Sequence, residues 1–152
     1  MKTDTPSSLN TKNRHRVRVG RSSAGLGLFA SDSFKKGERI VEYTGKRLTN
    51  EQVKRVVENR YLLEINDRYT INGSSRENIA RYANHACKPN AIAETVRGRA
   101  FLIAKKAIRP DEEIVWDYGK EYFNDFIKDG GCRCTTCVAK RKTAPGGAVK
   151  PV

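Results

Sequence analysis

The sequence is poor in the features that membrane and secreted proteins need. It has no apolar stretch near the roughly 18 residues of a membrane-spanning helix, so no membrane partner is expected. Its polar N-terminus lacks the hydrophobic segment of a secretory signal, which argues against export. Without export, metal ligation explains the four cysteines better than a disulfide framework does. We therefore expect an intracellular protein.

Acids are scarce at both ends of the chain. Residues 1–24 hold six lysines and arginines against one acid, and residues 132–152 hold five against none, within a formal net charge of +13. These ends are either solvated tails or a weak, salt-sensitive contact with nucleic acid or a nucleosome, and both interpretations stay open. The length of 152 residues suffices for one domain with a buried core. Nothing in the sequence indicates an oligomeric state.

Short segments with apolar residues, separated by turn residues, dominate the chain. They predict strands at 17–19, 25–30, 40–43, 61–65, 69–72, 91–96, 99–104 and 113–118. A weak internal repeat, with an offset of 74 residues, relates residues 28–45 to residues 102–119. Whether it reflects shared patterning or duplication, it predicts two β-units of similar shape.

Three short helices are predicted. The first begins with a capping box at Thr49 and continues to about Asn59. The second is brief, from Ser75 to Tyr82, and the third covers residues 122–127. Many short strands and few helices predict a mainly β fold.

The run from Arg81 to Asn90 carries more chemistry than any other segment. It places a carboxamide, an imidazole and a thiol within four positions, at Asn84, His85 and Cys87. Taken alone, His85 would more often be a hydrogen-bonded core histidine. Its neighbours favour a functional role.

The cysteines are divided one plus three. Cys87 lies 45 residues before Cys132, Cys134 and Cys137, which are the only others. This division suggests that the distant thiol and the C-terminal cluster close on one metal, with the tail folded back beside residues 81–90. The alternative is a redox pair of Cys134 and Cys137 with a buried Cys87.

Four motifs and the cysteine-rich tail occur together in one order. The motifs are GLGLF at 25–29 with EYTG at 42–45, YTING at 69–73, residues 81–90, and EIVWDYG at 113–119. Over residues 15–138 the chain resembles a SET domain followed by a post-SET segment. The resemblance implies small curved β-sheets around a pseudoknot of residues 81–90 and the Tyr118 segment. The implied boundaries are a flexible lead-in at 1–14, a SET domain at 15–124, a post-SET zinc-binding segment at 125–140 and a flexible basic tail at 141–152.

SET domains are the fold of protein-lysine methyltransferases that use S-adenosyl-L-methionine, so the resemblance implies that activity. The substrate would be a histone or another basic protein tail, and cofactor and peptide would enter from opposite faces. The implied catalytic and channel residues are Tyr118, Tyr43 and Trp116. The implied cofactor-binding residues are Gly25, Leu26, Gly27, Leu28, Arg81, Asn84, His85, Tyr118 and Phe123. The implied zinc ligands are Cys87, Cys132, Cys134 and Cys137.

Three features need separate comment. Trp116 stands where the family usually has Phe or Tyr, and the larger indole predicts that only one or two methyl groups fit. In the tail, only two residues separate Cys134 from Cys137, fewer than the four usual before the last cysteine. Tyr43 has an alternative interpretation as an ordinary core aromatic.

Two other function classes stay open. One is a catalytically silent SET module that binds basic tails or chromatin. The other is a small zinc-bearing nucleic-acid binder, although neither basic end interleaves aromatic residues as a stacking surface would. The expected location is the cytoplasm for a bacterial protein, and the nucleus or chromatin for a eukaryotic or host-delivered one.

Overall fold

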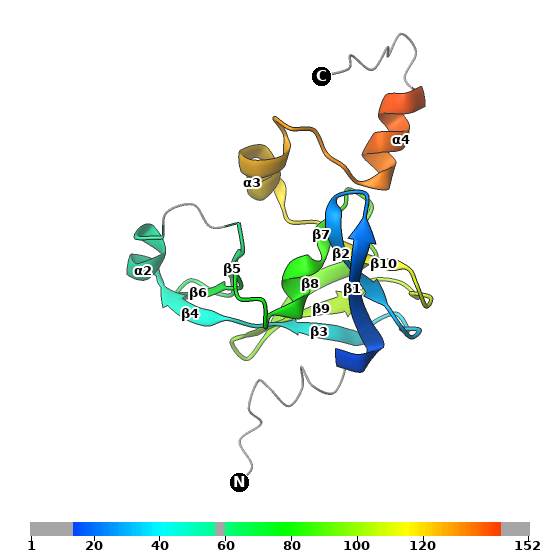
Figure 1. Cartoon of the computed structure of the whole chain (residues 1–152). Helices are drawn as coiled ribbons and strands as arrows, with labels where there is room; N and C mark the ends of the chain where they lie inside the picture. Colours follow the sequence, from blue (N-terminus) through cyan, green and yellow to red (C-terminus); the bar gives the residue numbers. More distant parts are fainter. Residues whose placement is uncertain (1–13, 57–59, 144–152) are drawn as a thin grey trace.

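A computed structural model describes residues 14–56 and 60–143, and its strands form two sheets (Figure 1). The larger sheet has the order β1-β2-β10-β8-β9-β3, with β7 paired to β10. Its strands are β1 (Val17–Ser22), β2 (Gly25–Ala30), β3 (Arg39–Tyr43), β7 (Asn84–His85), β8 (Ala91–Val96), β9 (Arg99–Ala104) and β10 (Glu113–Trp116). The smaller sheet has the order β4-β6-β5, built from β4 (Lys46–Thr49), β5 (Leu62–Glu64) and β6 (Tyr69–Asn72). The predicted mainly β fold of small curved sheets with few short helices is confirmed.

Helix α2 (Asn50–Lys54) starts where the capping box predicted it. The Thr49 hydroxyl accepts from the Gln52 N–H at 3.3 Å, and the Gln52 side chain accepts from the Thr49 N–H at 2.9 Å. The helix ends at Lys54, short of the predicted end near Asn59, and residues 57–59 lie outside the described part of the chain.

The later helices differ from their predictions. The brief helix is a 3-10 turn (Ile79–Tyr82) that begins after Asn78, because Ser75 uses its hydroxyl to accept from Glu77 N at 3.3 Å in a local bend. The third helix is α3 (Lys120–Tyr122) continued by a π-helical turn (Phe123–Ile127). Helix α4 (Thr135–Thr143) was not predicted, and it reaches three residues into the segment expected to be a flexible tail. Residues 144–152 of that segment lie outside the described part.

The two repeat units pack against each other and build the centre of the core. Phe34 and Ile108, which the 74-residue offset relates, pair with each other through two backbone hydrogen bonds of 2.9 Å. On one side of this bridge β2 pairs with β10, and on the other side β3 pairs with β9. Leu28, Ile40 and Leu102 are fully buried there. Each unit is therefore a strand-turn-strand segment that covers the other.

Strand β7 brings the Arg81–Asn90 run beside β10. It runs parallel to β10, with Asn84 opposite Val115, and the Ala86 N–H donates to the Trp116 carbonyl at 3.0 Å. The Asn90 side chain continues this pairing, since its amide donates to Glu113 O at 2.8 Å and its oxygen accepts from Val115 N at 2.9 Å. The two segments predicted to form a pseudoknot thus lie side by side.

Gly73 marks a close approach that affects the candidate site. A Cβ at this buried position would lie 2.3 Å from Tyr43 Cε1 and 2.5 Å from Asn78 Nδ2. The Asn78 amide itself donates to the Gly73 carbonyl at 3.0 Å and accepts from Thr44 N at 3.0 Å. There is no room for a methyl group unless Tyr43 or Asn78 moves.

Gly73→Ala is therefore expected to lower the free energy of unfolding by about 1–3 kcal/mol through overpacking. Urea denaturation measures this change. Gly130→Ala is the matched control, because a Cβ at Gly130 meets nothing within 4 Å. Equal stabilities for the two variants would contradict the close packing of Gly73 on Tyr43.

Helix α4 lies near the tip of the β1–β2 hairpin, whereas α3 is set apart from α4 (Figure 1). The Ser23 hydroxyl in that tip donates to the Arg133 carbonyl at 3.2 Å. This contact ties the cysteine-rich tail to the first hairpin. None of the helices in the described residues has the length and apolar character needed to cross a membrane.

Candidate functional site

Two neighbouring cavities lie between the sheets and the C-terminal segment. The larger one has a volume of about 420 Å³ and the narrow one about 50 Å³. The residues that line both are Arg60, Tyr61, Arg81, Tyr118 and Tyr122. The cavities therefore share a wall, and Tyr118 is part of it.

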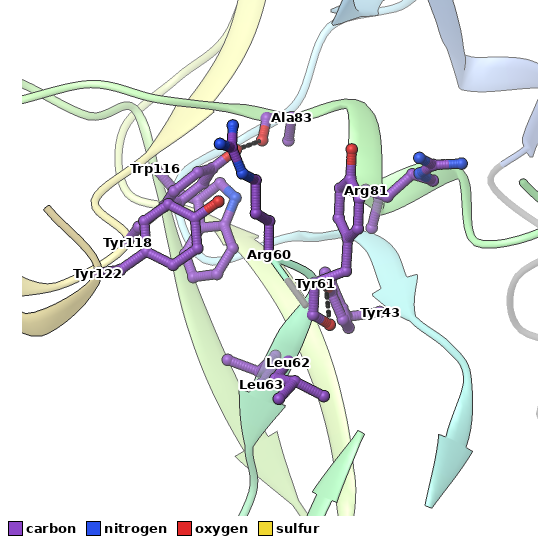
Figure 2. A pocket seen from close by; sticks show the side chains of 11 residues that line it. Tyr43, Arg60, Tyr61, Leu62, Leu63, Arg81, Ala83, Trp116, Tyr118 and Tyr122 are labelled. Carbon is purple, nitrogen blue, oxygen red and sulfur yellow. Dashed lines mark hydrogen bonds between the residues drawn. The ribbon is translucent and has the colours of Figure 1, made fainter. Parts of the chain in front are cut away.

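The narrow cavity brings together the three predicted catalytic and channel residues (Figure 2). Tyr43, Trp116 and Tyr118 form consecutive edge-to-face contacts, with ring centroids 6.5 Å apart for the first pair and 4.8 Å for the second. Tyr122 extends the series, since its ring lies 4.8 Å from that of Tyr118. Tyr43 is both a buried core residue and a wall of this cavity, so its two interpretations are compatible.

Two of the phenols in this cavity donate hydrogen bonds. The Tyr43 hydroxyl donates to the Tyr61 carbonyl at 2.7 Å, and the Tyr118 hydroxyl donates to the Ala83 carbonyl. Burial raises the pKa of both Tyr43 and Tyr118 far above the ordinary value for a phenol. Both phenols are therefore protonated near neutral pH in the protein alone.

Trp116 brings one more polar group to the narrow cavity. Its indole Nε1 is buried and has no hydrogen-bond partner among the described residues. A buried donor without a partner is costly and uncommon in folded proteins. Trp116 lines the narrow cavity, so this unpartnered N–H group lies behind the cavity wall.

Asn84 lines the larger cavity and anchors the first hairpin. Its side-chain amide donates to the Leu26 carbonyl at 2.8 Å and to the Ser22 hydroxyl at 3.1 Å. It also donates to the Glu113 carboxyl at 3.3 Å. Burial raises the pKa of Glu113, and the hydrogen bond from Asn84 partly offsets this rise.

The larger cavity collects only some of the residues predicted to bind a cofactor. Arg81, Asn84, His85 and Tyr118 line it. Residues 25–28 do not: Ala24, just before them, is in the wall, while Leu28 is fully buried in the core. Phe123 lies behind His85, with ring centroids 5.5 Å apart.

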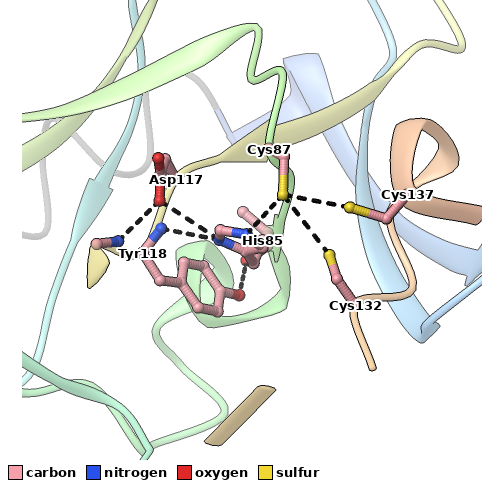
Figure 3. Close-up of polar contacts among 8 residues, drawn as sticks. His85, Cys87, Asp117, Tyr118, Cys132 and Cys137 are labelled. Atoms are coloured by element: carbon pink, nitrogen blue, oxygen red, sulfur yellow. Dashed lines mark hydrogen bonds and ion pairs between the residues drawn. The ribbon is translucent and has the colours of Figure 1, made fainter. Parts of the chain in front are cut away.

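His85 connects the segment that follows β10 to the thiols (Figure 3). Its Nδ1 accepts from the Tyr118 N–H at 3.1 Å, so the proton of the neutral ring belongs on Nε2, 3.6 Å from the Cys87 sulfur. Burial lowers the pKa of His85, partly opposed by Asp117, and favours the neutral ring. His85 is thus placed to donate to a Cys87 thiolate while it holds the Tyr118 backbone.

The four cysteines form one cluster, in which every sulfur lies within 4.8 Å of the others. Four thiolates around a Zn²⁺ ion with bonds of about 2.3 Å would lie about 3.8 Å apart. The Cys87 sulfur lies 3.9 Å from that of Cys132 and 3.5 Å from that of Cys137. The donor set therefore fits a tetrahedral metal, and the exposed Cys87 within the cluster disfavours the redox-pair alternative.

The start of α4 accounts for the short spacing of the last two cysteines. Thr135 and Thr136 form the first turn of the helix and present Cys137 to the cluster. Burial opposes ionisation of Cys134, but N–H groups of Cys87 and Cys137 lower its pKa to about 6, and Cys137 N lies 3.4 Å from its sulfur. A thiolate is the form that binds a metal.

Several cavity residues were not predicted from the sequence. They include Ala24, Arg60, Tyr61, Gly131 and Arg133. Arg60 and Arg133 come from segments without a motif, and only the folded tail and the approach to β5 bring them to the cavities. Their positive charge was the single available signal.

Fold and site together define a mainly β domain whose cysteine-rich tail closes over a pair of cavities. Residues 25–119 match the family model for the SET domain, and the chain belongs to the SET-domain family. Its C-terminal cysteine cluster fits a post-SET segment.

Relatives of this family are named as histone methyltransferases. The chain is 32% identical over 138 residues to "Histone-lysine N-methyltransferase 2D" of Homo sapiens, covering 83% of this chain and 2% of that protein. It is 35% identical over 125 residues to "Histone-lysine N-methyltransferase set-2" of Caenorhabditis elegans, and the match covers 74% of this chain and 8% of that protein. It is 32% identical over 142 residues to "Histone-lysine N-methyltransferase, H3 lysine-4 specific" of Saccharomyces cerevisiae, and the match covers 84% of this chain and 13% of that protein. The chain thus spans a small part of these much longer relatives.

Proposed function

We propose that this protein is a protein-lysine N-methyltransferase that uses S-adenosyl-L-methionine. The observation that carries the proposal is the pair of cavities with a shared wall at Tyr118, one wide and one narrow and aromatic. A wide cavity suits a nucleoside cofactor, and a narrow apolar one suits the alkyl chain of a lysine. The relatives, all named histone-lysine methyltransferases, support the same reaction.

The chain contributes alignment and a dry channel to this reaction. S-Adenosyl-L-methionine, when bound, supplies a methyl group on a positive sulfonium. The walls formed by Tyr43, Trp116 and Tyr118 would exclude water from the lysine amine, and this desolvation lowers its pKa and keeps it neutral. The Tyr118 hydroxyl and the Ala83 carbonyl, joined by a hydrogen bond, present polar groups at the shared wall. No strong base is needed.

We further propose that the cysteine cluster holds Zn²⁺ as a structural ion. Four thiolates leave no open position, which is typical of structural zinc sites. Cys132 and Cys134 also line the larger cavity, so the ion would hold a wall of the cofactor site.

The proposal is tested with radiolabelled S-adenosyl-L-methionine, mixed histones and a lysate of the source organism. Label on protein that depends on Tyr118 supports the enzyme. Cofactor binding without transfer to any protein would instead indicate the silent SET module. Basic protein tails such as those of histones are the substrates we propose, which places the protein on chromatin in a eukaryotic cell.

We also propose that the basic C-terminal end of the described chain binds polyanions. Lys140, Arg141 and Lys142 are exposed in the last turn of α4. Such a turn suits weak, salt-sensitive contact with nucleosomal DNA.

The indole of Trp116 is expected to limit the product to mono- or dimethyllysine. Trp116→Phe removes bulk and the unpartnered N–H from the narrow cavity, and should raise the ratio of higher to lower methylation states about tenfold. Intact-mass spectrometry of the product measures this ratio. Trp116→Tyr keeps a hydrogen-bond donor, so its ratio should lie between those of the original protein and Trp116→Phe. Ready trimethylation by the original protein, unchanged in Trp116→Phe, would contradict the role of the indole.

A further inference from the structure

The walls of the two cavities carry positive charge without compensation. Three of their lining residues are arginines, at positions 60, 81 and 133, and none is an aspartate or glutamate. Arg60 and Arg81 line both cavities and stand among the aromatic side chains of the narrow one (Figure 2). A basic peptide that delivers a lysine to this site must approach these guanidinium groups.

Arg81 is held by its neighbours. Its guanidinium lies 4.4 Å from the centre of the Tyr61 ring and 5.2 Å from that of Tyr82, and its Nε is buried. Its charge is a fixed part of the wall.

Of the two arginines that line the narrow cavity, Arg60 is the accessible one. It is exposed, and its guanidinium lies over the Phe126 ring at 5.5 Å. A cation–π contact uses the face of the guanidinium and leaves its N–H edges for a carboxylate. Within residues 14–56 and 60–143, no acid forms an ion pair with it.

The position of Arg60 determines which part of a peptide it meets. A lysine side chain that occupies the narrow cavity leaves its two sequence neighbours at the rim, about 3.3 Å further along an extended chain on either side. Arg60 is exposed and lines the narrow cavity, so its side chain lies where that cavity opens to solvent. The exposed acids Glu121 and Asp125 line neither cavity, so they can meet only more distant parts of the peptide.

We propose that Arg60 selects substrates in which an acidic residue directly precedes or follows the target lysine. An adjacent carboxylate would pair with Arg60, whereas an adjacent lysine or arginine would be repelled by Arg60 and Arg81. This inference rests on the proposed methyltransferase function and narrows its substrate class. The target is then a lysine beside an acid, within a protein that is otherwise basic.

The test uses three pools of 11-residue peptides with one central lysine and random uncharged residues elsewhere. The pools carry Glu, Gln or Arg on both sides of the lysine. We expect kcat/KM to be about three- to tenfold higher for the Glu pool than for the Gln pool, and lower by a similar factor for the Arg pool. The difference should lie mainly in KM and shrink at 1 M salt, where charges are screened.

Substitution of Arg60 separates a direct role from general electrostatics. Arg60→Gln should remove most of the preference, and Arg60→Glu should reverse it. Arg55→Glu is the matched control, because Arg55 is exposed and lines neither cavity but undergoes the same change of charge. Thermal unfolding checks that each variant is folded.

Binding of fluorescent peptides in the presence of S-adenosylhomocysteine distinguishes this inference from the proposed function. If no pool is methylated but the Glu pool still binds best through Arg60, the methyltransferase proposal fails and the preference stands. Equal affinities and equal kcat/KM for the three pools would overturn the role of Arg60. A preference that Arg55→Glu abolishes as fully as Arg60→Glu would do the same.

Discussion

Tyr118→Phe is expected to lower kcat/KM for methyl transfer at least about 100-fold, as the loss of a preorganised donor at a reacting centre does. The variant keeps the aromatic ring and its contacts with Trp116 and Tyr122, but it loses the hydroxyl that donates to Ala83 at the shared wall of the cavities. Affinity for the cofactor should change little, since the ring still lines the larger cavity. Single-turnover kinetics and calorimetric titration measure the two effects separately.

Tyr82→Phe is the control for this substitution. Tyr82 is a partly buried tyrosine packed on the same core, and it lines neither cavity. Loss of the Tyr118 hydroxyl also leaves the buried Ala83 carbonyl without its partner, which is expected to cost about 1–3 kcal/mol of stability. Assays are therefore made well below the unfolding temperature. Comparable rates for Tyr118→Phe and Tyr82→Phe would refute a catalytic role for the phenol.

Cys87→Ser and Asn84→Ala should separate the two halves of the Arg81–Asn90 run. Cys87→Ser removes one of four thiolates, and we expect bound zinc to fall from about one ion per chain to a small fraction after mild chelation. Because Cys132 and Cys134 also form a wall of the larger cavity, cofactor affinity should fall at least about tenfold as this wall loosens. Hydrogen exchange should show faster opening of α4, while the β8–β9 hairpin remains protected.

Asn84→Ala should weaken cofactor binding without loss of zinc. Asn84 lines the larger cavity and ties the first hairpin to β7 through Leu26 and Ser22, but it is not in the thiol cluster. Cofactor affinity is expected to fall at least about tenfold, as when bonds to a buried polar site are lost, while zinc content stays unchanged. Metal analysis and calorimetry on both variants test this. Loss of zinc from Asn84→Ala would show that the two roles are not separable.

The elements that the sequence predicted well are those with local causes. The β8–β9 hairpin follows from alternating residues around Arg97 and Gly98, which adopt positive φ of 52° and 75° in the turn. The start of α2 follows from the Thr49 and Gln52 side chains, which bond to backbone groups three residues away.

The elements that the sequence missed depend on distant partners. Strand β7 has two residues, and it is a strand only because β10 lies beside it. Helix α4 has a polar, basic sequence without a clear apolar face, and the thiol cluster at its first turn places it. The helix predicted at residues 122–127 is present, but its π-helical form over Phe123–Ile127, which brings Phe126 and Ile127 to the larger cavity, has no sequence signature of its own.

The sequence by itself determined the family, and it predicted the cluster of four cysteines and the three aromatic residues that line the narrow cavity, because each depends on residue types in a fixed order. The tertiary structure decided which of these groups meet. It placed Arg60 and Arg133 in the cavity walls and left residues 25–28 out of them. It also placed His85 between the Tyr118 backbone N–H and the Cys87 sulfur. The physical reason is that a cavity is formed by side chains from distant segments, and packing of the whole chain sets their distances.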